Sequence, residues 1–148
     1  MSGTMILSAE NDREYAFFIV DIDNFKRVND TYGHASGDFV IAEFARNLKD
    51  HFREDDIVGR IGGDEFAVFL KIPNREWLEK KAQQMAAGLR QNVKTDSGVC
   101  SVSASIGIAV YPEMGTDFVT LYKNADLALY YTKKNGKNGY TIFRKEYK

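Results

Sequence analysis

The hydrophobic and polar positions of this chain follow two periods, one typical of strands and one of helices. Residues 15–21 form an unbroken apolar run that ends in a carboxylate, which predicts a central strand buried on both faces. Residues 102–110 alternate bulky with small side chains, which predicts a strand with one large and one small face. The runs 57–61 and 66–70 flank Gly-Gly-Asp-Glu at 62–65 and predict a β-hairpin, whose two glycines can adopt positive φ.

Helical spacing appears in three other segments. Apolar residues recur at helical positions from Asp38 onward, Asn74 is expected to cap a second helix, and Thr116 a third helix that Gly136 ends. With a closing strand at 140–143, the order is β-α-β-β-α-β-α-β. Its first six elements match the ferredoxin-like βαββαβ arrangement. We therefore expect an α+β fold, in which a mainly antiparallel central sheet with flanking helices gains a C-terminal helix and strand.

Length and composition limit the classes of protein. We expect one domain over residues 5–148 and leave residues 1–4 out of it as a remnant of the chain start. The net charge of −1 provides no basic field for nucleic acid or anionic lipid, so neither partner is expected. A single cysteine, Cys100, excludes an internal disulfide. No apolar run reaches the ~20 residues of a membrane span and no signal pattern is present, so we expect a cytoplasmic location.

Acidic side chains stand at two turns that the predicted fold brings together. Asp21 and Asp23 follow the first strand, while Asp64 and Glu65 lie at the hairpin tip. Right-handed crossovers place these strands side by side, so the carboxylates are expected to converge. Close carboxylates repel one another unless a cation neutralises them, and Mg²⁺ suits such ligands. The alternative is a solvated acidic edge without metal. Neither a P-loop nor a Gly-x-Gly-x-x-Gly motif is present.

These motifs together resemble the GGDEF domain, the diguanylate cyclase family. The Gly-Gly-Asp-Glu-Phe motif is intact at 62–66, and Arg60 precedes it. Residues 21–38 resemble the second signature of the family almost throughout, and residues 105–109 and 125–130 match two further blocks. The resemblance covers roughly residues 5–146, and several motifs in the right order are far more specific than one.

The resemblance implies a palm-like fold and an activity that condenses two GTP molecules into cyclic di-GMP and two pyrophosphates. It implies that Asp21, the carbonyl of Ile22 and Asp64 hold Mg²⁺, for which Mn²⁺ is a possible substitute. Asp64 is the implied proton acceptor for the ribose 3′-hydroxyl, and Glu65 is a second candidate base. Lys26 is implied to neutralise charge that develops on the phosphates.

A further group of residues is implied to bind the nucleotide. These residues are Phe25, Asn29, His34, Asp38, Gly62, Gly63, Lys133 and Lys137. Asn29 and Asp38 would bind guanine, whose N1–H and N2 amino donors suit a carboxylate, and the two lysines would reach the terminal phosphates. Structural alternatives remain: Asn29 could cap a turn, Asp38 could be a helix N-cap, and the lysines could only stabilise a helix end.

An Arg-x-x-Asp sequence at Arg53 and Asp56 stands at the usual distance before the hairpin. By resemblance, these two residues form an inhibitory site that binds the product. Arginine can present a fork to phosphate or guanine, and aspartate can accept hydrogen bonds from guanine. The alternative is a surface charge cluster at a helix end.

Two departures from the family and two rival functions complete the prediction. Only Met5–Asn11 precedes the first strand, so the chain is expected to begin part-way along the family's N-terminal helix, and Lys137 replaces a common arginine. One domain binds one GTP, so the reaction requires a homodimer, which a fused sensor domain normally arranges. The rivals are a catalytically silent module that binds GTP or cyclic di-GMP, and a cyclase for another purine, which Asp38 disfavours.

Overall fold

In the computed structural model, which describes residues 13–147, a five-stranded sheet runs through the centre of the molecule in the order β2-β3-β1-β6-β7. Neighbouring strands are antiparallel except for β6 and β7, which are parallel. The strands are β1 (Glu14–Ile22), β2 (Ile57–Gly62), β3 (Glu65–Ile72), β4 (Gln91–Thr95), β5 (Gly98–Val102), β6 (Ala104–Tyr111) and β7 (Gly139–Ile142). The helices are α2 (Phe25–Tyr32), α3 (His34–Asp50), α4 (Arg75–Gly88), α5 (Phe118–Lys134) and a short 3-10 helix (Lys145–Tyr147). The predicted α+β class is confirmed.

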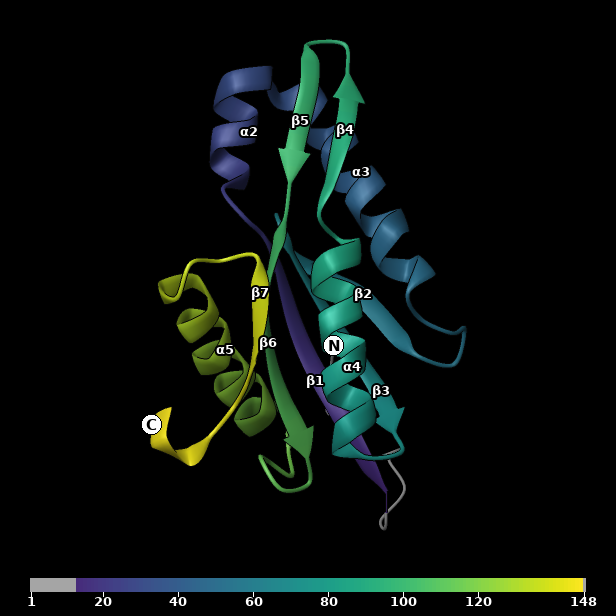
Figure 1. Ribbon diagram of the computed structural model, residues 1–148, viewed down its shortest axis with the longest axis vertical. Coiled ribbons are helices and arrows are strands. Elements are labelled where there is room, and N and C mark those ends of the chain that lie inside the picture. Colours follow the sequence, from purple (N-terminus) through teal and green to yellow (C-terminus); the bar gives the residue numbers. More distant parts are fainter. Residues whose placement is uncertain (1–12, 148) are drawn as a thin grey trace.

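Helices cover both faces of the central sheet, as Figure 1 shows. On one face, Phe18 of β1 and Ile108 of β6 belong to the same core cluster as Phe44 of α3 and Leu78 of α4. On the other face, Phe17 belongs to the core cluster of α5. This alternation explains why residues 15–21 are apolar without interruption: both sides of β1 are buried.

The small face of β6 brings α5 unusually close. A Cβ atom at Gly107 would lie 2.1 Å from the carbonyl oxygen of Ala125 and 2.4 Å from the amide nitrogen of Leu129. The backbone of α5 therefore occupies the space that any larger side chain would need. The predicted strand with one large and one small face is confirmed for the part of it that lies in β6.

The second sheet, β4 with β5, packs beside α2 and α3 at one end of the molecule (Figure 1). Val28, Val40 and Cys100 lie in a separate small core beneath it. Neither this hairpin nor α2 was predicted from the sequence, and the predicted strand 102–110 wrongly included Val102, which belongs to β5. In the structure the chain leaves one sheet for the other at Ser103, whose carbonyl accepts a hydrogen bond from the Asp23 amide at 2.9 Å.

Helix ends agree with the prediction in part. Asn74 caps α4 by accepting a hydrogen bond from the Trp77 amide, as expected. The cap of α5 is Asp117 rather than Thr116, and α3 begins at His34, four residues before Asp38. None of the helices within residues 13–147 is both long and apolar enough to cross a bilayer. The predictions about residues 1–4 and Met5–Asn11 lie outside the described residues.

Candidate active site

The end of β1 and the tip of the β2–β3 hairpin lie against each other. Asp21 stands opposite Glu65 in the antiparallel register of β1 and β3. The Ile22 amide donates a hydrogen bond to the Asp64 carbonyl at 3.1 Å, which ties the strand end to the turn. The structure thus brings together residues that are more than forty positions apart in the sequence, namely Asp21, Ile22, Asp64 and Glu65.

Arg60 closes the hairpin tip from within the hairpin itself. Its Nε donates to the Gly63 carbonyl at 2.9 Å and lies 3.3 Å from the Gly62 carbonyl. The turn consists of Gly63 and Asp64, and neither Gly62 nor Gly63 adopts the positive φ that the sequence analysis expected. A Cβ atom at either glycine would meet open space among the described residues. Neither conformation nor internal packing requires glycine here, whereas close approach of a ligand to the backbone would.

Asp21 carries a charge that its surroundings only partly accommodate. Its side chain is 10% exposed and forms an ion pair with Lys133 through Oδ2, while Oδ1 is buried without a hydrogen-bond partner among residues 13–147. Burial raises the pKa of Asp21 to about 6, although the Lys133 ammonium opposes the shift; the charges of Asp64 and Glu65 add to it. A buried carboxylate oxygen without a donor is an available ligand for a cation.

Glu65 is held by a residue that the sequence analysis did not assign to the site. The Tyr122 hydroxyl of α5 donates to Glu65 Oε1 at 3.0 Å, and the Tyr122 ring packs beside Phe17 and Phe118. Burial, followed by the hydrogen bond and charge of Glu65, raises the pKa of Tyr122 to about 12. The helical period of α5 predicts that the Tyr122 ring packs in the core. Only the assembled sheet shows that its hydroxyl contacts Glu65.

Asp23 does not join the other carboxylates, which corrects the expectation that it would. Ser103 Oγ donates to its Oδ2 at 2.6 Å, Ser105 Oγ donates to its Oδ1, and the Asn138 amide donates to Oδ2 at 3.0 Å. Both carboxylate oxygens are therefore satisfied within the protein. Asp23 fixes the start of β6 and of β7 relative to the end of β1, and this role suits a structural residue better than a metal ligand.

Helices α2 and α3 bring two of the predicted nucleotide-binding residues, Phe25 and Asn29, together beside Gly37. A Cβ atom at Gly37 would lie 1.8 Å from Asn29 Oδ1 and 3.4 Å from the Phe25 ring, so the Asn29 side chain fills the space that glycine leaves. Phe25 also packs against two core clusters. Asp38 follows one residue later and lies inside α3, which rules out the alternative that it is an N-cap.

A pocket of about 400 Å³ separates α3 from β2, and Asp38 lies on its wall. The other lining residues are Ile41, Ala42, Ala45, Lys49, Val58, Gly59, Arg60 and Phe66. The pocket therefore lies between the helix that carries Asp38 and the β2–β3 hairpin. Lys26 in the first turn of α2 and His34 in the first turn of α3 are exposed.

The two lysines that were expected to reach phosphates have partners in this structure. Lys133, in the last turn of α5, is paired with Asp21. Lys137 Nζ donates to Asn24 Oδ1 at 2.8 Å, and Asn24 leads from β1 into α2. Both cations thus lie next to segments that carry the candidate carboxylates and the candidate base-binding residues.

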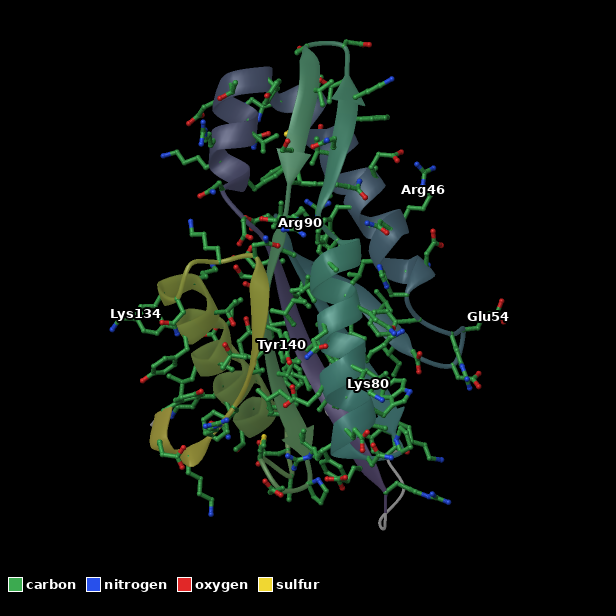
Figure 2. The ribbon with its side chains drawn as sticks, in the orientation of Figure 1. Arg46, Glu54, Lys80, Arg90, Lys134 and Tyr140 are labelled. Carbon is green, nitrogen blue, oxygen red and sulfur yellow. The ribbon has the colours of Figure 1, made fainter. Side chains whose placement is uncertain are left out.

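Arg53 and Asp56 form one closed turn between α3 and β2. The Arg53 amide donates to Asp56 Oδ2 at 2.9 Å, and the Asp56 amide donates to the Arg53 carbonyl at 3.0 Å. Because β2 begins at Ile57 and ends at the hairpin tip, this turn and the carboxylates lie at opposite ends of one strand. In Figure 2 the labelled Glu54 marks the turn at the margin of the molecule.

Comparison with known proteins shows the family of this chain. The family model described as diguanylate cyclase, GGDEF domain, matches residues 4–139. The chain belongs to the GGDEF domain family. The solved GGDEF domain of TpbB from Pseudomonas aeruginosa superposes with a TM-score of 0.89 at 32% identity, covering 96% of this chain and 90% of that one. The coiled coil and GGDEF domain of DgcB from Caulobacter crescentus, solved in complex with cyclic di-GMP, superposes with a TM-score of 0.78 at 26% identity over 95% of this chain and 75% of that one.

Among curated relatives of this GGDEF domain is MucR of Pseudomonas aeruginosa, named a bifunctional diguanylate cyclase/cyclic di-GMP phosphodiesterase. The two are 37% identical over 133 residues, which is 90% of this chain. The chain spans only 19% of MucR and 30% of TpbB, which is named a diguanylate cyclase. In each of these larger relatives, the matching domain is therefore only one part of the protein.

The residues around Asp21 fit a magnesium ion that shares its coordination with a ligand. Within residues 13–147, no three His, Cys, Asp or Glu side chains are grouped to hold a metal by themselves. Mg²⁺, however, usually takes one or two carboxylates and completes its shell with water and phosphate oxygens. The unpartnered Oδ1 of Asp21, beside Asp64, meets that requirement.

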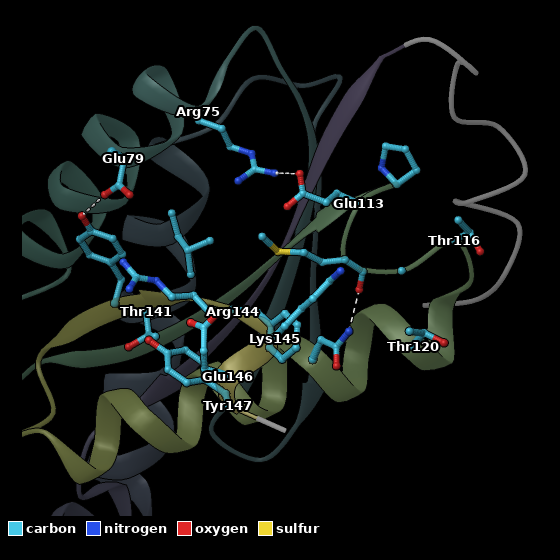
Figure 3. Close-up of a pocket in the computed structure, with 17 residues that line it drawn as sticks. Arg75, Glu79, Glu113, Thr116, Thr120, Thr141, Arg144, Lys145, Glu146 and Tyr147 are labelled. Carbon is cyan, nitrogen blue, oxygen red and sulfur yellow. Dashed lines mark hydrogen bonds and ion pairs between the residues drawn. The ribbon is translucent and has the colours of Figure 1, made fainter.

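A larger cavity, of about 950 Å³, lies away from these residues (Figure 3). It is lined by the start of α4, the β6–α5 loop, β7 and the C-terminal segment. Arg75 on its wall is paired with Glu113 at 3.1 Å, and Tyr140 donates to Glu79. None of the predicted site residues lines it, so size alone does not mark the active site of this domain.

Proposed function

We propose that this GGDEF domain is a Mg²⁺-dependent diguanylate cyclase, which condenses two GTP molecules into cyclic di-GMP and releases two pyrophosphates. The observation that carries the proposal is the junction of β1 with the hairpin tip. That junction sets Asp21 beside the turn that holds Asp64, and a buried carboxylate oxygen of Asp21 has no partner among the residues that the structure describes. The intact motif at 62–66 supports the same conclusion.

In the proposed reaction, the 3′-oxygen of each GTP bonds to the α-phosphorus of the other, so two phosphodiester bonds form and both α–β phosphoanhydride bonds break. The hydroxyl proton passes to Asp64, with Glu65 as the second candidate base, and the electron pair leaves with pyrophosphate. Bound Mg²⁺, or Mn²⁺ in its place, would neutralise the phosphates and favour ionisation of the 3′-hydroxyl. Asp21 and Asp64 would hold that ion, with the Ile22 carbonyl as a third ligand.

We assign guanine recognition to the α2–α3 end of the site. Asp38 would accept hydrogen bonds from the guanine N1–H and N2 amino group, and Asn29 and Phe25 lie beside Gly37, the residue before it. Lys26 and Lys137 would contact phosphates, since they lie next to the segment that joins β1 to α2. His34, the first residue of α3, would lie near the same nucleotide.

Each domain provides a single nucleotide site, so catalysis requires two copies that face each other. We propose such a homodimer, arranged by further domains like those that make the relatives longer than this chain. We also propose that product binds at Arg53 and Asp56, a turn that lies apart from the carboxylates. The DgcB structure in complex with cyclic di-GMP supports product binding within the family.

A product-resolved assay tests the proposal. The protein at high concentration is incubated with Mg²⁺ and either GTP or ATP, and the products are separated by chromatography. We expect cyclic di-GMP from GTP alone. Asp64→Ala should reduce its formation at least about 100-fold, because general-base catalysis alone contributes that much. Asp96→Ala is the matched control, since Asp96 occupies the turn of the other hairpin, β4–β5.

Three results would contradict the proposal. Nucleotide binding without any product would favour the silent binding module. Product from ATP would favour a cyclase of another purine specificity. Cyclic di-GMP formation that survives Asp64→Ala would remove Asp64 from the chemistry.

A further inference from the structure

A lysine ammonium already occupies the vicinity of the three candidate carboxylates. Lys133 is ion-paired with Asp21, and the negative charges of Asp64 and Glu65 also attract it. The ammonium therefore acts as an internal cation in a cluster that a divalent ion would otherwise neutralise.

This internal cation satisfies the cluster only in part. It contacts Oδ2 of Asp21, while Oδ1 stays buried and has no donor within the described part of the chain. Glu65 is directed to the Tyr122 hydroxyl. One carboxylate oxygen is thus ready for a further cation, but the ammonium stands beside it.

We propose that Lys133 is an internal counter-ion of Asp21 that a divalent metal must displace before it binds there. The inference rests on the function proposed above, because it concerns the same carboxylates. Two cations on one carboxylate repel each other, so binding of a metal to the nucleotide-free domain must overcome the ion pair. Once displaced, the ammonium is available to the nucleotide phosphates.

The Asp21 and Lys133 side chains differ in conformational freedom, and this difference determines which of them moves when a metal binds. The Asp21 side chain is 10% exposed and its backbone lies in the centre of the sheet, between β3 and β6. The Lys133 side chain is 42% exposed and leaves α5 at the second-last residue of the helix. A flexible four-carbon stem at a helix end can swing into solvent without disturbing the core.

Titration of the nucleotide-free domain with Mn²⁺ tests this inference, with unbound Mn²⁺ measured by electron paramagnetic resonance. Lys133→Gln removes the competing charge and should tighten Mn²⁺ binding about fivefold or more, the lower range of coupling between sites. Lys133→Arg keeps a cation and should bind Mn²⁺ nearly as weakly as the unaltered domain. Lys134→Gln is the matched control, because Lys134 lies over the Tyr130 ring and projects away from the sheet in Figure 2.

The double variant Asp21→Asn with Lys133→Gln shows whether the effect acts through Asp21. The tighter Mn²⁺ binding that Lys133→Gln causes should disappear in this double variant. Thermal melts of every variant verify that the fold is intact. Equal Mn²⁺ affinity in the unaltered domain and in Lys133→Gln would overturn the inference and leave the proposed function standing. So would a tightening that persists in the double variant. Absence of Mn²⁺ binding in all variants would overturn both the inference and the metal site of the proposed function.

Discussion

Asp21 is the residue at which stability and the proposed chemistry conflict. Its buried carboxylate lies beside two other acidic residues, with one oxygen unpartnered. Such an arrangement is unfavourable for the folded protein alone and becomes favourable when a cation binds. Residues held in this way are common at functional sites.

We expect Asp21→Asn to raise the melting temperature in metal-free buffer at pH 7.5 by about 2–4 °C, the shift that ~1 kcal/mol gives in a domain of this size. Folding raises the pKa of Asp21 to about 6 from an ordinary value of 3.8. The folded state therefore binds this proton more tightly, so ionisation of Asp21 costs stability above pH 6 and the cost fades toward pH 4. The difference in melting temperature between the variant and the unaltered domain should therefore shrink as the pH falls from 6 toward 4. Calorimetry at several pH values would measure it. A variant that melts lower at pH 7.5 would contradict this account.

At the same scale, the sequence identifies motif residues better than their partners. Asp21, Asp64 and Glu65 stand at recognisable turns, and strand order alone predicts that they meet. Tyr122 and the serines around Asp23 are not predictable, because a hydroxyl in an amphipathic helix or an alternating strand has many ordinary roles. Only the register between distant strands shows which acceptor each one reaches.

Among the elements, those with a strong hydrophobic period are predictable and those without one are not. Strand β1 and helices α3, α4 and α5 bury clear apolar stripes. Helix α2 buries only Val28, and β4–β5 contributes just three buried residues, Val93, Cys100 and Val102. Their stability comes from packing on α3 and on each other, which no local pattern encodes.

The contact between β6 and α5 depends on one glycine. Gly107→Ala should destabilise the domain by about 1–3 kcal/mol, because its Cβ would overlap the backbone of α5 at Ala125 and Leu129, and backbone cannot move aside as a side chain can. Gly139→Ala in the neighbouring strand β7 is the matched control, since its Cβ would lie an ordinary 3.8 Å from the nearest atom. Urea unfolding of both variants measures the effect. Equal stabilities would show that α5 can shift without cost.

Considered whole, the molecule has two charged regions at the ends of β2, the carboxylate cluster at the hairpin tip and the Arg53–Asp56 turn. Their separation would let product bind without entering the active site. The fold that separates the two regions follows from the predicted topology. The function of the second region does not follow from the sequence, because an arginine and an aspartate three positions apart also occur in surface turns that bind nothing.

Arg53→Ala should weaken inhibition by cyclic di-GMP about 10- to 100-fold, which corresponds to loss of ~1.5–3 kcal/mol of charge-assisted hydrogen bonding. Initial rates at increasing product concentration give the inhibition constant. Arg46→Ala serves as the control, because Arg46 is exposed on α3 and pairs with Glu43 of the same helix. Inhibition of the same strength in both variants would argue against this site.

In the proposed active site, the end of β1 and the tip of the β2–β3 hairpin together hold one divalent ion. A crystal of the domain with Mn²⁺ and a GTP analogue whose α–β bridging oxygen is a methylene group tests it, through the anomalous signal of the metal. We predict Mn²⁺ about 2 Å from a carboxylate oxygen of Asp21 and from one of Asp64, with phosphate oxygens completing the shell. Mn²⁺ bound to the phosphates alone, with both carboxylates turned away, would contradict the account.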